Sequence, residues 1–168
     1  MTQAEIKELI QKQRTFFHSG ATLDVEYRIH ALQKLKACIL KYENEINIAI
    51  RADLGKCAFE SYMCETGLVL SELTYMLKHI QKFAKEHTVR TPLAQFHSRS
   101  YQKPSPYGVT LIMSPWNYPF MLTIEPLIDS LAAGNTAILK PSAYSAHTTA
   151  LISRMIKECF DEKYVAVV

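Results

Sequence analysis

The stretch GVTLIMSPWNYPFMLTIEPLIDSLAAGNTAILKPS, residues 108–142, decides the fold that we expect for this chain. It opens with residues 108–113, an unbroken apolar run between turn residues that is typical of a strand buried on both faces. Residues 120–133 then favour a helix, and Gly134 is suited to the left-handed position that ends a helix. Residues 136–139 are a second apolar run. The stretch therefore predicts a strand, a helix and a second buried strand in succession.

The residues that follow continue this alternation. Residues 146–160 carry apolar side chains on one stripe of a helix, and residues 164–168 form a third apolar strand. The resulting order is the βαβαβ pattern of a doubly wound parallel sheet, whose crossovers are right-handed. Ligands bind such sheets beyond the carboxyl ends of the strands. We therefore expect the loop 114–119 and the turn at Lys140 to lie near each other.

The residues before this stretch are mainly helical in pattern. Residues 5–17 favour a first helix, and either Thr22 or Asp24 can cap a second helix that continues to a stop at Gly55. Residues 58–85 favour a further helical region. The chain thus starts with a helical segment before the sheet begins.

Residues 96–103 have an alternating pattern that ends at a proline, which predicts an edge strand. The fold that we expect is α/β: an N-terminal helical segment followed by the first half (βαβαβ) of a Rossmann-like parallel sheet. We divide it into a helical region with one extended strand, residues 1–106, and the first half of a dinucleotide-binding domain, residues 107–168. A sheet of only three strands is expected to have its core on one side and an apolar edge at its last strand.

Composition excludes several classes of protein. The chain has 168 residues and a net charge of +3, and its Lys and Arg residues form no basic run, so we expect no nucleic-acid partner. We expect no signal peptide and no transmembrane segment, since the most apolar window, residues 121–139, is interrupted by charged side chains. The four cysteines lack CxxC spacing, which predicts no metal site. Free thiols indicate a cytoplasmic location.

Three side chains at the expected ligand edge have more than one interpretation. The amide of Asn117 offers two donors to a ligand, but an asparagine in such a loop also forms turns by bonding to its own backbone. Trp116, the single tryptophan, is either a core or interface aromatic or a ligand wall. Lys140 is either a solvated strand end or a cation for a ligand. The phosphate-binding pattern GxGxxG is absent, so no standard pyrophosphate turn is predicted.

Several motifs together resemble the aldehyde dehydrogenase family, over essentially the whole chain. PWN (115–117) followed by AAGNTAILKPS (132–142) is similar to the front of that family's nucleotide domain. RTFFHSG (14–20), RADLGK (51–56) and the two glutamates Glu60 and Glu65 resemble the helical start of its class 3, fatty-aldehyde-type branch. The resemblance implies the N-terminal portion of an enzyme that uses NAD or NADP to oxidise aldehydes to carboxylic acids through a cysteine thiohemiacetal.

The resemblance also implies roles for single residues. Asn117 becomes the catalytic donor that stabilises the oxyanion formed when a thiolate attacks the aldehyde, and Lys140 binds the ribose hydroxyls of the adenosine. The familiar motif KPSE here ends in Ala143, and the missing glutamate would have repelled a 2′-phosphate, so better tolerance of NADP is expected. The implied cofactor-binding residues are Met113, Ser114, Pro115, Trp116, Asn117, Lys140 and Ser142.

Other parts of the family's machinery have no match in these residues. The nucleophilic cysteine, the general base and the glycine-rich pyrophosphate turn are expected downstream, and we interpret all four cysteines (Cys38, Cys57, Cys64 and Cys159) as helix-packing residues. We therefore expect the 168 residues alone to be an inactive fragment; the alternative is a non-catalytic binding or oligomerisation module. Residues 96–103 match the family's oligomerisation region, so a homodimer is expected for the full-length enzyme.

Overall fold

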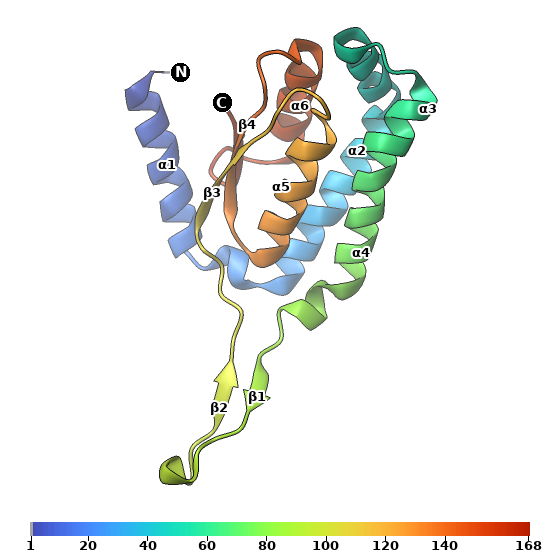
Figure 1. The fold of residues 1–168 in the computed structure, drawn as a ribbon. Helices are drawn as coiled ribbons and strands as arrows, with labels where there is room; N and C mark the ends of the chain where they lie inside the picture. The colour runs from blue at the N-terminus through green and yellow to red at the C-terminus, as the bar shows by residue number, and fades with distance from the viewer. Residues whose placement is uncertain (1) are drawn as a thin grey trace.

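The computed structural model describes residues 2–168 and contains a three-stranded parallel sheet between helical layers (Figure 1). This confirms the expected α/β class, with a helical N-terminal segment before the parallel strands. The elements are, in chain order, α1 (Gln3–His18), η1 (Ala21–Leu23), α2 (Val25–Leu54), α3 (Ala58–Ser61), η2 (Tyr62–Thr66), α4 (Gly67–Phe83), β1 (His87–Val89), η3 (Leu93–Gln95), β2 (Ser100–Gln102), β3 (Val109–Met113), α5 (Met121–Ala133), β4 (Thr136–Lys140), α6 (Ala146–Cys159) and β5 (Val165–Val167).

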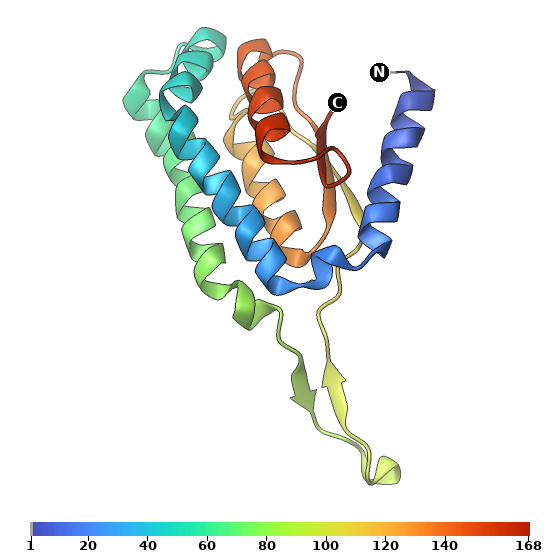
Figure 2. The same ribbon diagram turned by 180° about the vertical axis from the view of Figure 1, so that it is seen from behind.

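The parallel sheet has the order β3-β4-β5, with β4 in the centre. Val109 lies opposite Thr136 and Met113 opposite Lys140, so β3 and β4 end at the same level. The helices α5 and α6 connect these strands and lie on one face of the sheet (Figures 1 and 2). Gly134 ends α5 in the predicted left-handed conformation, with φ of 94°.

The long helix α2 packs on the outer side of α5 and α6, and α4 lies beside it (Figure 2). Asp24 is the cap of α2, because its Oδ1 accepts the N–H of Glu26 at 3.1 Å. Leu32, Ile39 and Ile46 on α2 are fully buried in the main core. That core is continuous across residues of both expected regions, and the boundary at residue 106 stays a prediction.

The first helix, α1, covers the opposite face of the sheet (Figure 1). Its Leu9 packs with Ile138 of β4 and Ala166 of β5 in a second, smaller core. The buried amide of Gln13 donates to the carbonyl oxygens of Ala137 and Glu162, both at 3.0 Å. The expectation of a core on one side only is therefore wrong, because α1 returns to the sheet and packs on its second face, which no local pattern in the sequence indicates.

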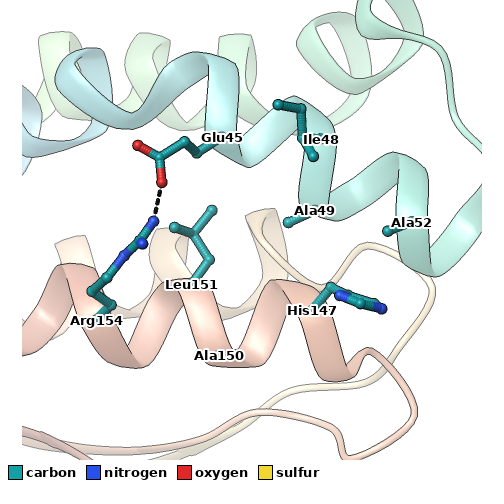
Figure 3. Close-up of a pocket in the computed structure, with 8 residues that line it drawn as sticks. All are labelled: Glu45, Ile48, Ala49, Ala52, His147, Ala150, Leu151 and Arg154. Atoms are coloured by element: carbon teal, nitrogen blue, oxygen red, sulfur yellow. Dashed lines mark hydrogen bonds and ion pairs between the residues drawn. The ribbon is translucent and has the colours of Figure 1, made fainter.

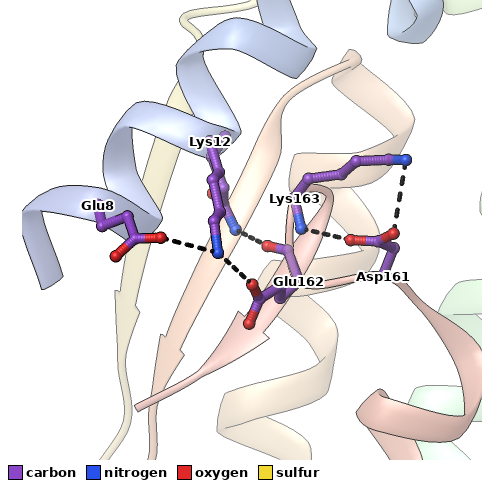
Figure 4. A network of polar contacts seen from close by, with 6 residues as sticks. Glu8, Lys12, Asp161, Glu162 and Lys163 are labelled. Carbon is purple, nitrogen blue, oxygen red and sulfur yellow. Dashed lines mark hydrogen bonds and ion pairs between the residues drawn. The ribbon is translucent and has the colours of Figure 1, made fainter. Parts of the chain in front are cut away.

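One ion pair, Lys12–Glu162, joins α1 to the loop before β5, and two others lie beside it within α1 and within the loop (Figure 4). Lys12 Nζ lies 3.2 Å from a carboxylate oxygen of Glu8 and 2.9 Å from one of Glu162. Lys163 Nζ lies 3.4 Å from Asp161 Oδ2. Because these side chains are half exposed or more, the burial of Leu9 and Gln13 is the stronger attachment.

The strand β3 differs from its prediction in one respect. Leu111 is 61% exposed and Met113 is 69% exposed, so β3 is not buried on both faces, whereas β4 is buried except at Lys140. The reason is position: β3 lies at an edge of the three strands, so no further strand within residues 2–168 covers the side chains of Leu111 and Met113.

An antiparallel hairpin of β1 and β2 projects from the body of the molecule (Figures 1 and 2). The predicted strand 96–103 is a strand only over Ser100–Gln102, and its partner His87–Val89 was not predicted. His97, with φ of 78°, takes a left-handed conformation that a strand does not allow.

The expected helical region 58–85 is also interrupted. Residues Tyr62–Thr66 form one π turn between α3 and α4, and the N–H of Gly67 donates to the carbonyl of Tyr62. A Cβ on Gly67 would lie 2.7 Å from that carbonyl oxygen, so this turn requires glycine there. Turns of this kind occur often at functional sites.

A buried guanidinium joins α2 to the end of α5. Arg28 Nε donates to Thr22 O at 2.6 Å, Nη1 to Ala132 O at 3.2 Å and Nη2 to Leu23 O at 3.0 Å. Gly134 lies against this group, since a Cβ at that position would be 2.9 Å from Arg28 Cζ. The three hydrogen bonds leave the guanidinium little freedom to move away.

We expect Gly134→Ala to destabilise the protein more than Gly55→Ala. Both glycines have positive φ, which costs alanine about 1–2 kcal/mol, but nothing lies within 4 Å of a Cβ at Gly55. Overpacking against Arg28 adds roughly 1–3 kcal/mol for Gly134→Ala alone. Urea unfolding followed by circular dichroism measures both variants, and equal losses of unfolding free energy would contradict the role given to Arg28.

Candidate functional site

The predicted site residues meet at the carboxyl edge of β3 and β4. The N–H of Ser114, directly after β3, donates to the carbonyl of Lys140, at the end of β4, at 3.3 Å. The loop 114–119 and the turn at Lys140 are therefore neighbours, as the strand order predicted.

The loop after β3 is fixed to the first turn of α5. The Oγ of the buried Ser114 lies 2.6 Å from Thr123 Oγ1, which itself donates to Pro119 O at 2.6 Å. Trp116 is 53% exposed, and Asn117 is exposed as well. The loop is therefore held in place at Ser114, and its side chains Trp116 and Asn117 are exposed.

The side chain of Asn117 makes no hydrogen bond to any other residue of the range 2–168. Only its main-chain carbonyl has a partner, Lys56 Nζ at 3.1 Å. The turn interpretation required a bond between the amide and the nearby backbone, and the structure contains none. The two amide donors are thus available to a ligand.

Behind this loop lies a buried ion pair that the sequence analysis did not identify. Lys56 Nζ is 2.7 Å from Glu65 Oε1, and the Glu65 side chain has no exposed surface. Glu65 Oε2 accepts the N–H groups of Phe120 at 2.9 Å and Met121 at 3.3 Å. Glu65 therefore caps the N-terminus of α5 from a remote part of the chain.

A sequence signal for this contact did exist. The N-cap of α5 is Phe120, which has no side-chain acceptor, and no Ser, Thr, Asp or Asn precedes the helix at that position. A buried helix start without a local cap needs an acceptor from elsewhere. The pattern could indicate that a remote acceptor exists, but not that the acceptor is Glu65.

The turn after β4 is fixed to the next crossover helix, α6. Ser142 Oγ accepts the N–H of Tyr144 at 3.2 Å, and Ser142 O accepts the hydroxyl of Thr149 at 2.9 Å. Lys140 and Ala143 are exposed. Ser142 thus shapes the turn, and the ammonium of Lys140 extends from it.

The N-terminus of α6 is also capped from α2. Asp53 Oδ1 accepts the N–H of His147 at 3.0 Å, and Oδ2 accepts that of Thr148 at 2.7 Å. Helix N-termini at this edge of a parallel sheet are common phosphate sites, but here Glu65 and Asp53 already occupy them. Neither α5 nor α6 can therefore cradle a pyrophosphate in this arrangement.

The remaining exposed residues fit the nucleoside part of a dinucleotide. Lys140 offers three donors to a ribose diol, and Met113 and Trp116 give exposed apolar surface for a base or sugar. The phosphate-binding part of a dinucleotide site would have to come from other residues, in agreement with the missing GxGxxG pattern.

Two of the four cysteines are unsuited to act as nucleophiles because they are buried in the core. Cys38 and Cys159 are buried, and burial raises both thiol pKa values, that of Cys159 to about 12. Their packing role was predicted correctly. Cys57 is exposed and caps α3, its Sγ accepting the N–H of Glu60 at 3.5 Å, so its predicted packing role is wrong. Cys64 is half-buried in the π turn.

A groove of about 450 Å³ lies elsewhere, between α2 and α6 (Figure 3). Its lining includes the buried residues Ala49 and Leu151, and the Glu45–Arg154 ion pair lies at one end. Neither Asn117 nor Lys140 lines it. Within residues 2–168, no group of three or more His, Cys, Asp or Glu side chains could hold a metal ion. No helix in that range is long and apolar enough to cross a membrane.

Comparison with known proteins gives a consistent result. The family-wide sequence profile described as "Aldehyde dehydrogenase family" matches residues 1–168. A 4,4'-diaponeurosporen-aldehyde dehydrogenase of Staphylococcus aureus is 40% identical over 163 residues, which is 97% of this chain and 36% of that protein. A dog protein named "Aldehyde dehydrogenase, dimeric NADP-preferring" is 35% identical over 98% of this chain and 36% of its own length.

A solved structure described as the substrate-bound state of Staphylococcus aureus AldH superimposes with a TM-score of 0.95 at 40% identity, over 97% of this chain and 36% of that one. The chain thus spans about a third of the length of the relatives that it matches. On the evidence of a family match over all 168 residues, together with a closely superimposing fold, the chain belongs to the aldehyde dehydrogenase family.

Proposed function

We propose that this chain supplies the oxyanion donor and one wall of the dinucleotide site in an enzyme that oxidises aldehydes to carboxylic acids with NAD or NADP. The observation that carries the proposal is the meeting of Asn117 and Lys140 at one edge of adjacent parallel strands, both exposed and both held on braced turns. Family membership supplies the reaction class.

The proposed role of Asn117 follows from its free amide. When a thiolate adds to an aldehyde, negative charge develops on the carbonyl oxygen, and a prepositioned N–H donor stabilises it. Such a donor lowers the barrier by about 2.7–4 kcal/mol. Because the family resemblance matches none of the four cysteines to that thiolate, the 168 residues alone are expected to form no reduced nicotinamide when supplied with an aldehyde.

The proposed cofactor contacts are made by the two turns. The loop at Met113, Ser114, Pro115 and Trp116 would lie along the dinucleotide, and Lys140 beside Ser142 would donate to the hydroxyls of the adenosine ribose. The bound cofactor accepts hydride in this chemistry. The named relative that prefers NADP supports the inclusion of both cofactors.

A first test measures dinucleotide binding to the isolated chain. We expect NAD or NADP to shift the NMR signals of residues 113–117 and 140–142, with a Kd on the order of 1 mM, because only part of the ligand has partners. Lys140→Ala is expected to abolish these shifts. Lys157→Ala, an exposed lysine near the other end of α6, is the matched control and should leave them unchanged. Shifts confined to other residues would contradict the proposed site.

A second test concerns cofactor choice at Ala143. A glutamate there would accept bonds from the ribose hydroxyls and repel a 2′-phosphate. We expect Ala143→Glu to weaken NADP binding relative to NAD by about tenfold, or about 1.4 kcal/mol. Ala143→Gln keeps the acceptor without the charge and should change the ratio much less. An unchanged ratio in Ala143→Glu titrations would rule out this explanation.

We also infer that the projecting hairpin is an assembly surface for a homodimer. The same surface would serve the alternative function, that of a non-catalytic oligomerisation module. Leu93, Phe96 and Tyr101 are exposed on it, although large apolar side chains are usually buried. Tyr101→Asp is expected to reduce the fraction of dimer in sedimentation velocity. The control is Tyr75→Asp, at a similarly exposed tyrosine on α4. Equal dimer fractions in the two variants would argue against the hairpin.

A further inference from the structure

We propose that Glu65 and Lys56 together are positioning residues for the Asn117 amide, and that they set the direction of the loop 114–119. The catalytic part of this proposal rests on the proposed function, in which Asn117 is the oxyanion donor. The positional part stands on the contacts of Glu65 and Lys56 alone.

The first step is the start of α5. Its first N–H groups need acceptors, and the residue at its N-cap, Phe120, is fully buried and has none in its side chain. Glu65 Oε2 takes two of these donors, from Phe120 and Met121. A negative charge at a helix N-terminus also interacts favourably with the helix dipole. Glu65 therefore determines where α5 begins.

The second step is the charge balance. A carboxylate without exposed surface is costly unless it is paired and fully hydrogen-bonded. Lys56, whose side chain is 11% exposed, provides the pairing charge at 2.7 Å. Removing either partner leaves the other charge buried and uncompensated. The two residues therefore act as one unit.

The third step links this unit to Asn117. Lys56 Nζ donates to the main-chain carbonyl of Asn117 at 3.1 Å and lies 4.0 Å from the ring centroid of Tyr118. One ammonium thus contacts Glu65 and two consecutive loop residues. Because the carbonyl of Asn117 is held, the side chain of the same residue projects in a defined direction relative to α5.

The fourth step is the origin of this geometry in the backbone. Glu65 lies within the π turn Tyr62–Thr66, where the N–H of Gly67 bonds to the carbonyl five residues earlier. The wider turn rotates the side chains that follow it relative to an α-helix. It places Glu65 and Thr66 in the interior, whereas Met63 on the same turn is exposed.

The experiment uses Trp116, the single tryptophan of the chain and the direct neighbour of Asn117. Its fluorescence therefore reports the loop without a background from other tryptophans. We expect Lys56→Met and Glu65→Gln each to increase acrylamide quenching of Trp116. We expect amide exchange of Phe120 and Met121 to become about tenfold faster in Glu65→Gln, equivalent to about 1.4 kcal/mol.

Two control variants separate positioning from general destabilisation. Glu60→Gln removes a charge from an exposed residue close to Glu65 and should change neither readout. Lys56→Arg keeps the cation and should restore most of the wild-type quenching. Thermal unfolding by circular dichroism is measured for every variant, and Lys56→Met provides the test if Glu65→Gln fails to fold.

The proposal is overturned if folded Lys56→Met and Glu65→Gln show the same Trp116 quenching and the same amide exchange as the wild type. It is also overturned if Glu60→Gln changes these two readouts as much as they do. The measurements need neither dinucleotide nor aldehyde. A loop that loosens as expected, in a chain whose Lys140 titration fails, would refute the proposed function and leave the positioning role intact.

Discussion

The buried carboxylate of Glu65 is the interaction on which the candidate site depends. The N-cap of α5 is an apolar residue, Phe120, so the first N–H groups at this helix end would have no acceptor in the interior without a remote one. Glu65 meets this need, and Lys56 makes its charge tolerable at 2.7 Å. Because the same ammonium reaches the carbonyl of Asn117, the start of the helix and the exposed amide of the loop are held by one set of contacts.

The helical N-terminal segment supplies a carboxylate cap to each of the two crossover helices. Glu65 caps α5 and Asp53 caps α6, so two carboxylates occupy helix N-termini that could otherwise bind a phosphate. The start of α5 is therefore satisfied within the protein, and the loop after β3 has no GxGxxG pattern. The groups left exposed at the edge are side chains, namely Trp116, Asn117 and Lys140, and the proposed function assigns them to the nucleoside and the developing oxyanion.

The sheet itself is stabilised from two sides by very different means. The main core lies between the sheet and the helices α2, α4, α5 and α6, and it contains most of the large buried side chains. On the other face α1 contributes one small cluster around Leu9 and the bonds of Gln13 to two carbonyl groups. On the edge strand β3, Leu111 and Met113 remain exposed, and Leu111 lines a cavity that also includes Lys140 of the candidate site.

The sequence by itself determined the order of strands and helices from residue 108 onward, the end of α5 at Gly134 and the meeting of the loop 114–119 with the turn at Lys140. These features follow from local patterns: apolar runs form strands, glycine ends a helix, and parallel strands end at a common edge. Only the tertiary structure decided the ion pair of Lys56 with Glu65, the return of α1 to the sheet and the exposure of β3. Each of these depends on contacts between residues far apart in the chain, and Glu65 reaches its partners only because a π turn, which no local pattern indicated, directs it inward.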